Sequence, residues 1–309
     1  MGPTGRISPP YPVILQELRK GRAIPFLGSG ASRLELPAAA GATSAAPPLP
    51  VLPSGGELAR TLADASHFPA SSDEERDDLA KVASYYVDVS SREALRSKLR
   101  LVFANSSYAS NQLHQLLAAV ADGESLPGGA MFVTTNYDTL LEKAFQDAGK
   151  KYDLVVYPAD NKSYGNALLW WRHGESRPTP MKPSDVDVND FRQKNVIYKM
   201  HGSIHITAEE WDGFVITEED YVTFLARMKH AVPGAFRGYF KSRAFLFLGY
   251  GLRDWNFRVL LKEVSNRDIK SWAIKFDPSM FEQSVWPQRS VIVYDEKLED
   301  FVKEMQAIL

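Results

Sequence analysis

Three short segments carry the residues of this chain that are best suited to chemistry. Residues 28–32 (Gly-Ser-Gly-Ala-Ser), 134–138 (Thr-Thr-Asn-Tyr-Asp) and 199–203 (Lys-Met-His-Gly-Ser) each follow an apolar run, so each lies where a buried strand ends. In an open α/β sheet, ligands bind in the crevice outside the carboxyl ends of the strands. We therefore expect a glycine-rich phosphate turn, an Asn/Asp pair and a histidine to meet there. Such a set indicates a nucleotide cofactor that is chemically attacked and not merely held.

The first segment offers backbone groups for an anion. Glycines at two positions let the chain approach a pyrophosphate, and the helical turn after them offers free N–H groups. A plain strand-to-loop turn is the alternative, which a lone GxG favours. Hydride transfer is disfavoured, because the third glycine of the dehydrogenase fingerprint is replaced and no acidic strand end follows about 20 residues later. We assign cofactor contact to the whole turn: Gly28, Ser29, Gly30, Ala31 and Ser32.

The other two segments offer side chains for a reaction. Asn136 and Asp138 follow a buried strand, and the alternative for them is a backbone turn and a cap for the helix expected from Thr139. His201 ends another strand, and Gly202 beside it leaves access to the ring. A histidine in that position is a better candidate for a base than one in a polar or helical stretch. The histidines show no metal-ligand spacing, so we expect no bound metal.

Together with a later glycine-rich strand end, these segments resemble the sirtuin superfamily. Its order of GxGxS, NxD and HG is completed here by residues 247–252 (Phe-Leu-Gly-Tyr-Gly-Leu). The sequence is most similar to the bacterial sirtuin-like domains of antiphage defence, which show TTNYD, KxHGS, TEEDY (residues 217–221) and FLGYGLxD. The resemblance covers residues 12 to 300, which is nearly the whole chain.

The resemblance implies an activity and roles for three residues. The activity is hydrolysis of NAD, as substrate, to nicotinamide and ADP-ribose, which depletes NAD in infected cells. Asn136 would lie under the nicotinamide ribose and orient the attacking water, and Asp138 would contact the nicotinamide side. His201 would activate a ribose hydroxyl or the water. Asn136 and His201 are therefore the expected catalytic residues.

The adenosine half of the cofactor is expected at a different strand end. By resemblance, Gly249, Tyr250 and Gly251 contact it. Asp277 follows a further strand and is a candidate contact for the adenosine ribose.

The composition excludes several classes of protein. The chain has no cysteine, which excludes disulfides and thiolate zinc sites, including the four-cysteine module that frames the acyl-peptide groove of deacylating sirtuins. The net charge of −2 does not indicate a general nucleic-acid-binding surface. No apolar run approaches the ~20 residues that cross a bilayer, and the amino terminus lacks a secretory signal pattern. We expect a cytoplasmic protein without membrane contact or direct nucleic-acid binding.

The pattern of apolar runs predicts one α/β domain. Strands that are continuously apolar alternate with amphipathic stretches, which favours a Rossmann-like parallel sheet of about six strands flanked by helices. A small helical module is expected at residues 57–125 and a flexible arm at residues 1–10. Residues 34–56 are rich in Ala, Pro, Gly and Ser and predict a loop, either a lid for the crevice or an insertion without a role. Residues 159–191 are expected to be irregular.

Three other functions are alternatives to NAD hydrolysis, and the resemblance also raises the question of how the activity is controlled. A protein deacylase is disfavoured by the missing cysteines, and a sensor that binds NAD or ADP-ribose without turnover is disfavoured by the intact Asn136 and His201. The third alternative is a toxin-like subunit that is silent alone. The chain ends just after its last expected helix, so we expect no fused sensor. We expect instead a homo-oligomer and a separate regulatory protein, such as an ATPase or a nucleic-acid sensor.

Overall fold

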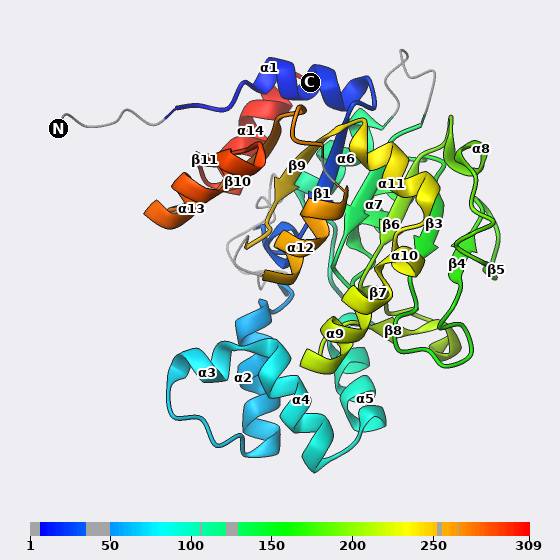
Figure 1. Ribbon diagram of the computed structural model, residues 1–309, viewed down its shortest axis with the longest axis vertical. Helices are drawn as coiled ribbons and strands as arrows, with labels where there is room; N and C mark the ends of the chain where they lie inside the picture. The colour runs from blue at the N-terminus through cyan, green and yellow to red at the C-terminus, as the bar shows by residue number, and fades with distance from the viewer. Residues whose placement is uncertain (1–6, 35–49, 106, 122–128, 252–254, 265) are drawn as a thin grey trace, which may run out of the picture.

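A large sheet covered by helices on both faces forms the body of the molecule, and a group of helices stands at one end of it (Figure 1). This computed structural model describes residues 7–34, 50–105, 107–121, 129–251, 255–264 and 266–309. The predicted α/β class and Rossmann-like parallel sheet are confirmed, although the sheet has nine strands.

Seven of the nine strands run parallel, in the order β11-β10-β9-β1-β2-β6-β3. They are β1 (Ala23–Leu27), β2 (Met131–Thr134), β3 (Asp153–Val156), β6 (Val196–Lys199), β9 (Ala244–Leu248), β10 (Ser271–Lys275) and β11 (Val291–Asp295). The chain places β2, β3 and β6 on one side of β1 and later β9, β10 and β11 on the other. The strand order thus reverses at β1, which is where ligands bind in sheets of this kind.

Two antiparallel strands extend the sheet where the sequence predicted only irregular chain. β4 (Leu168–Trp171) pairs with β3, and β5 (Thr179–Met181) pairs with β4 at the edge. A short helix, α8 (Val188–Phe191), follows them. The prediction for residues 159–191 was therefore wrong. It overlooked β4, a short buried apolar run within polar chain, and β5 escaped notice because it is three residues long and contains Pro180, a residue that strands tolerate only at an edge.

Apolar stripes of helices cover the two faces of the sheet. One face carries α1 (Tyr11–Arg19), α6 (Gln112–Val120), α7 (Leu140–Asp147) and α14 (Leu298–Ala307). The other carries α8, α9 (Glu218–Ala226), α10 (Met228–Ala231), α11 (Gly234–Lys241) and α12 (Trp255–Val264). The short α13 (Met280–Val285) lies between β10 and β11 in the chain. Since both faces are covered, the central strands are buried along their whole length.

The helical module consists of four helices with a core of their own. They are α2 (Gly55–Ser66), α3 (Asp73–Asp77), α4 (Leu79–Val89) and α5 (Arg92–Phe103). Asp78 separates α3 from α4 within this module and caps α4 by accepting a hydrogen bond from the amide of Lys81. The structure places α6, which we expected in this module, on the sheet beside α7 and α14.

Three glycines let the turns after β1 and β9 touch backbone to backbone. The amides of Gly28 and Gly30 donate to the carbonyls of Leu248 and Gly249. A Cβ at Gly28 would lie 2.7 Å from the carbonyl oxygen of Gly249, and a Cβ at Gly249 would lie 2.0 Å from the amide nitrogen of Ala31. Gly249 also has a φ of +62°, which disfavours any side chain.

Gly249→Ala is therefore expected to destabilise the fold far more than a glycine-to-alanine substitution that only strains a left-handed backbone. Gly149 provides the matched control, because its φ is +65° but its Cβ would meet nothing within 4 Å. Gly149→Ala should cost about 1 kcal/mol of unfolding free energy, from left-handed strain only. Gly249→Ala adds a backbone clash and should cost at least about 3 kcal/mol in urea unfolding. Equal losses for the two variants would contradict this account of the contact.

Candidate functional site

A cavity of about 480 Å³ opens at the carboxyl ends of β1, β2, β6 and β9. One wall comes from the loops that follow these strands, and it includes Asn136, His201 and Tyr250. The opposite wall comes from residues 52–56 and from the helical module, through Leu58, Asp77, Leu79 and Phe103. A volume of this size lies in the usual range of small-molecule sites.

Asn136 presents one particular atom to this cavity. Its side-chain nitrogen donates to the carbonyl of Gly28 at 3.0 Å and to the hydroxyl of Ser32 at 3.1 Å. A carbonyl can only accept, so the amide orientation is fixed. Within the described residues no donor reaches the side-chain oxygen of Asn136, which leaves that oxygen as an acceptor for a ligand.

Asp138 joins the turn after β1 to the start of α7. Its Oδ2 accepts from the hydroxyl of Ser32 at 2.9 Å, and its Oδ1 accepts from the amide of Leu140 at 3.0 Å. The carboxyl group is buried but still lines the cavity. The bonds from Asn136 to Ser32 and from Ser32 to Asp138 form one chain. The carboxylate thus fixes the hydroxyl that in turn helps to orient the amide.

Tyr137, between these two residues, anchors the loop in the helical module. Its ring packs edge-on against Phe103 and Phe214, with centroids 5.5 and 5.4 Å away. Its hydroxyl donates to the carbonyl of Val215 at 2.6 Å. Phe103 belongs to α5 and Phe214 to β8 (Gly213–Phe214), which pairs with β7 (Gly202–Ser203). The loop that carries Asn136 is thereby held against both halves of the structure.

His201 also lines the cavity, in an apolar setting. Its ring contacts Phe224 and Tyr221 of α9 edge-on, at centroid distances of 4.9 and 5.6 Å. Burial lowers the pKa of His201 to about 3, so the imidazole is neutral at physiological pH. No hydrogen bond to its ring nitrogens occurs in the part of the chain that the structure describes. A neutral ring with one acceptor nitrogen can take a hydrogen bond from a hydroxyl or from water.

The structure brings most of the predicted site residues to this one cavity and sets the others behind or away from it. Those that line it are Gly28, Ser29, Ser32, Asn136, Asp138, His201, Tyr250 and Gly251. Gly30, Ala31 and Gly249 form the strand-to-strand contact behind it. Asp277 is exposed after β10 and does not line the cavity. Residues 252–254, which complete the last motif, lie outside the described residues.

The glycines are needed first for a contact between two strand ends, and not for the phosphate contact that the sequence suggested. The amides of Gly28 and Gly30 are occupied by carbonyls of the β9 turn, so they are not free for a phosphate. The exposed Ser29 keeps its place on the cavity wall. The close approach that the glycines permit is therefore first of all an approach between two strand ends.

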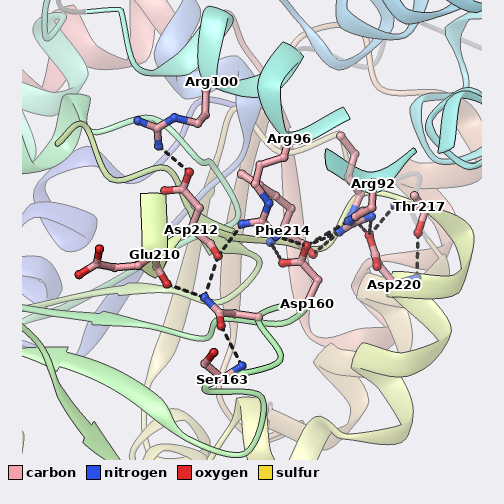
Figure 2. A network of polar contacts seen from close by, with 12 residues as sticks. Arg92, Arg96, Arg100, Asp160, Ser163, Glu210, Asp212, Phe214, Thr217 and Asp220 are labelled. Carbon is pink, nitrogen blue, oxygen red and sulfur yellow. Dashed lines mark hydrogen bonds and ion pairs between the residues drawn. The ribbon is translucent and has the colours of Figure 1, made fainter. Parts of the chain in front are cut away.

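Arginines of α5 tie the helical module to the body. Figure 2 shows Arg92, Arg96 and Arg100, spaced four residues apart on one face of the helix, reaching carboxylates of the body. Arg92 and Arg96 share Oδ2 of Asp160 at 2.9 Å, and Arg100 meets the fully buried Asp212 at 2.6 Å. Arg92 also binds Asp220, which caps α9. These ion pairs hold the second wall of the cavity in place.

Sequence reasoning missed the module's share of the site. It assigned no contact to Leu58, Asp77, Leu79 or Phe103, since nothing in a helical pattern indicates which strand ends it will face. Residues 34–56 were predicted to be a loop near the cofactor. Residues 35–49 lie outside the described residues, whereas residues 52–56 do line the cavity. The TEEDY motif contained a usable signal, because its Tyr221 lies on the wall beside His201.

The described residues contain neither a metal site nor a membrane-spanning helix. Among them, no group of three or more His, Asp or Glu side chains is arranged to hold a metal ion. No helix in this part of the chain is both long and apolar enough to cross a membrane.

Comparison with known proteins connects this geometry to a family. A family model described as a SIR2-like domain matches residues 130–294. A protein named NAD(+) hydrolase ThsA from Cytobacillus dafuensis is 27% identical over 193 residues, which are 62% of this chain and 31% of that protein. Its namesake from Acinetobacter baumannii (strain 532279) is 29% identical over 188 residues, 60% of this chain and 31% of that protein. The aligned regions thus span about a third of each relative's length.

A solved structure is also similar in outline. It is described as "Structural Basis for the Mechanism and Regulation of Sir2 Enzymes", and the match covers 97% of this chain and 98% of that one. With a TM-score of 0.40 and 12% identity, this likeness carries no argument about the site.

The two buried histidines should make the fold sensitive to acid. Burial lowers the pKa of His114 to about 4 and that of His201 to about 3, whereas both titrate near 6.5 when unfolded. The unfolded state then binds more protons below its pKa, so stability falls as pH drops from about 6.5 towards 4. Each histidine should contribute a loss of about 2 kcal/mol between near pH 7 and near pH 5.

Urea unfolding of His114→Gln and His201→Gln at the two pH values measures these losses. Each variant should lose less stability on acidification than the wild type, by that amount. His173→Gln, at an exposed position, is the control and should behave as the wild type. An unchanged pH dependence in His201→Gln would contradict its burial as a neutral ring.

Proposed function

This chain belongs to the family of SIR2-like domains, and on that basis we propose that its cavity binds NAD and hydrolyses it to nicotinamide and ADP-ribose. The observation that carries the proposal is the meeting of Asn136 and His201 on one cavity at the point where the strand order reverses. The names of the ThsA relatives supply the reaction.

The reaction breaks the bond between C1′ of the ribose and the nicotinamide nitrogen. The electron pair of that bond goes to the nicotinamide ring, which leaves as a neutral molecule, and C1′ gains oxocarbenium character as in glycoside cleavage. Water adds its oxygen to C1′ and loses one proton. The site must therefore shield a cation and place one water molecule against it.

The geometry suits Asn136 for placing that water. Its nitrogen is engaged by Gly28 and Ser32, so its oxygen is the atom that can accept a hydrogen bond from the water. Through this bond the water's lone pair can be directed at C1′. The chain of bonds to Asp138 keeps the amide from rotating.

His201 is suited to accept a hydrogen bond from a ribose hydroxyl or from the water. Its low pKa, caused by burial, makes it a weak base before substrate binds. We therefore assign it the polarisation of an O–H group as the cation develops, with the proton passing on to solvent. Its aromatic neighbours Tyr221 and Phe224 keep this side of the cavity apolar.

We extend the proposal to a biological setting and to control of the activity. The proposed setting is antiphage defence, in which this protein acts in the cytoplasm and depletes the NAD of the infected cell. The motif resemblance supports this setting. Uncontrolled hydrolysis would harm the host, so we propose that activity depends on self-assembly or on a separate partner, such as an ATPase or a nucleic-acid sensor. The exposed faces of the helical module are the surfaces that we assign to assembly.

Asn136→Ala and His201→Ala should each reduce nicotinamide release by about 10²-fold or more, the usual scale for losing a positioned catalytic group. Asn189→Ala and His173→Ala change the same residue types at exposed positions and should leave the rate unchanged. Release of nicotinamide from NAD, followed by chromatography, measures the effect. Binding of NAD without any release by the wild type would favour a sensor instead.

Control by assembly predicts that specific activity rises with protein concentration. Light scattering gives the mass of the species present, and NAD turnover is measured over the same concentration range. An oligomer that gains activity as it forms, alone or with the partner added, is the expected result. A monodisperse monomer with full and concentration-independent specific activity would contradict control by assembly.

A further inference from the structure

A lysine is buried completely at the end of β6, directly below the loop that carries Asn136. Lys199 has no exposed surface, which is rare for this residue type. It stands on the same face of β6 as Ile197, towards α7. Its neighbours in the ladder are Thr134 of β2 and Val156 of β3. A buried ammonium group requires partners, and those partners indicate what it does.

All three recorded partners of the ammonium group belong to residues 137–142. It donates to the carbonyl oxygens of Tyr137, at 3.3 Å, and of Asp138. It also donates to Oε1 of Glu142 at 2.9 Å, and this carboxylate is buried on α7. Lysine has three N–H donors, so the arrangement uses all of them.

This geometry fixes the backbone on which the catalytic side chain is mounted. Tyr137 and Asp138 directly follow Asn136, and their carbonyls turn away from the cavity towards the ammonium group. The carbonyl of Tyr137 also accepts from the amide of Ile204 at 3.2 Å, and Asp138 is held through its side chain by Ser32 and by the amide of Leu140. Lys199 is the group that binds two successive carbonyls at once.

We propose that Lys199 is a positioning residue for the hydrolysis, with Glu142 as its buried counter-ion. It does not touch the substrate, since it does not line the cavity. It acts by holding residues 137–138, and hence the oxygen of Asn136, in the place where that oxygen orients water. The expected effect on kcat rests on the proposed function, whereas the claim that Lys199 holds the loop backbone does not.

The alternative is a purely structural ion pair, and a pair of substitutions separates the two. Lys199→Met leaves Glu142 buried without its partner and should lower stability strongly. The double variant Lys199→Met/Glu142→Leu replaces both charges with apolar groups and should recover most of that stability. In the double variant the carbonyl of Asp138 lacks its lysine donor and that of Tyr137 keeps only the amide of Ile204, so the hold of Lys199 on the loop backbone is still lost.

Positioning predicts that the double variant recovers stability but not activity. Its kcat should stay about 10- to 100-fold below wild type, because a displacement of about 1 Å costs on that scale, while KM changes little. Hydrogen exchange in peptides covering residues 135–141 should be faster than in wild type, with the rest of the body unchanged. Arg172→Met breaks an ion pair with Asp153 beside β4, far from this loop in the sheet, and is the control for lost stability alone.

Each outcome decides between the two roles. Recovery of both stability and kcat in the double variant, with wild-type exchange in residues 135–141, would overturn the proposal. If the wild type releases no nicotinamide, the proposed function fails, and the exchange measurement still tests whether Lys199 holds the loop. If the double variant does not fold, Lys199→Arg replaces it as the test variant, because arginine keeps the charge and the hydrogen-bond donors. It should then show slower exchange in this loop than Lys199→Met, and equal exchange in the two would count against positioning.

Discussion

The immobilisation of the loop between β2 and α7 is the constraint on which the rest of the site depends. Three successive residues of this loop are held by parts of the molecule that are distant in the sequence. Asn136 binds the turn after β1, Tyr137 packs into the helical module, and Asp138 binds Ser32 and the start of α7. Lys199 holds the backbone from beneath. A single polar oxygen is thus presented to the cavity from a rigid frame, as preorganised sites require.

The helical module gives the cavity a second wall at what would otherwise be an open sheet edge. Its own core includes Leu62, Val82 and Leu99, and it meets the body through Tyr137 and Phe214. The arginines of α5 fix its approach by pairing with carboxylates that also bind backbone amides of the body. Partly buried pairs in a network with shared partners are worth more than isolated surface pairs. Apolar packing and charge pairing therefore set the width of the cavity together.

Much of the fold and of the site could be predicted from local patterns. The central strands were identified because each is a short run of apolar residues that ends at a polar motif, and β1 does end at Leu27, directly before the motif at residues 28–32. The Asn136 and His201 positions followed from that placement, and both line the cavity. The edge strand β5 was missed because it is short, exposed and contains Pro180. The place of α6 on the sheet was missed because its helical periodicity is like that of the module and does not record which core it joins.

The sequence by itself determined the class of the fold and the residue types that face the crevice, since strand ends and turn residues are encoded within a few positions of each other. Only the tertiary structure decided how these residues are used. It assigned Gly28 and Gly249 to a contact between two strands, and it gave Lys199 its partners on α7 and its preceding loop. It also supplied the second wall of the cavity from the helical module. The reason is physical: close packing and the pairing of buried charges join residues that are far apart in the chain, and no local pattern records which pairs will meet.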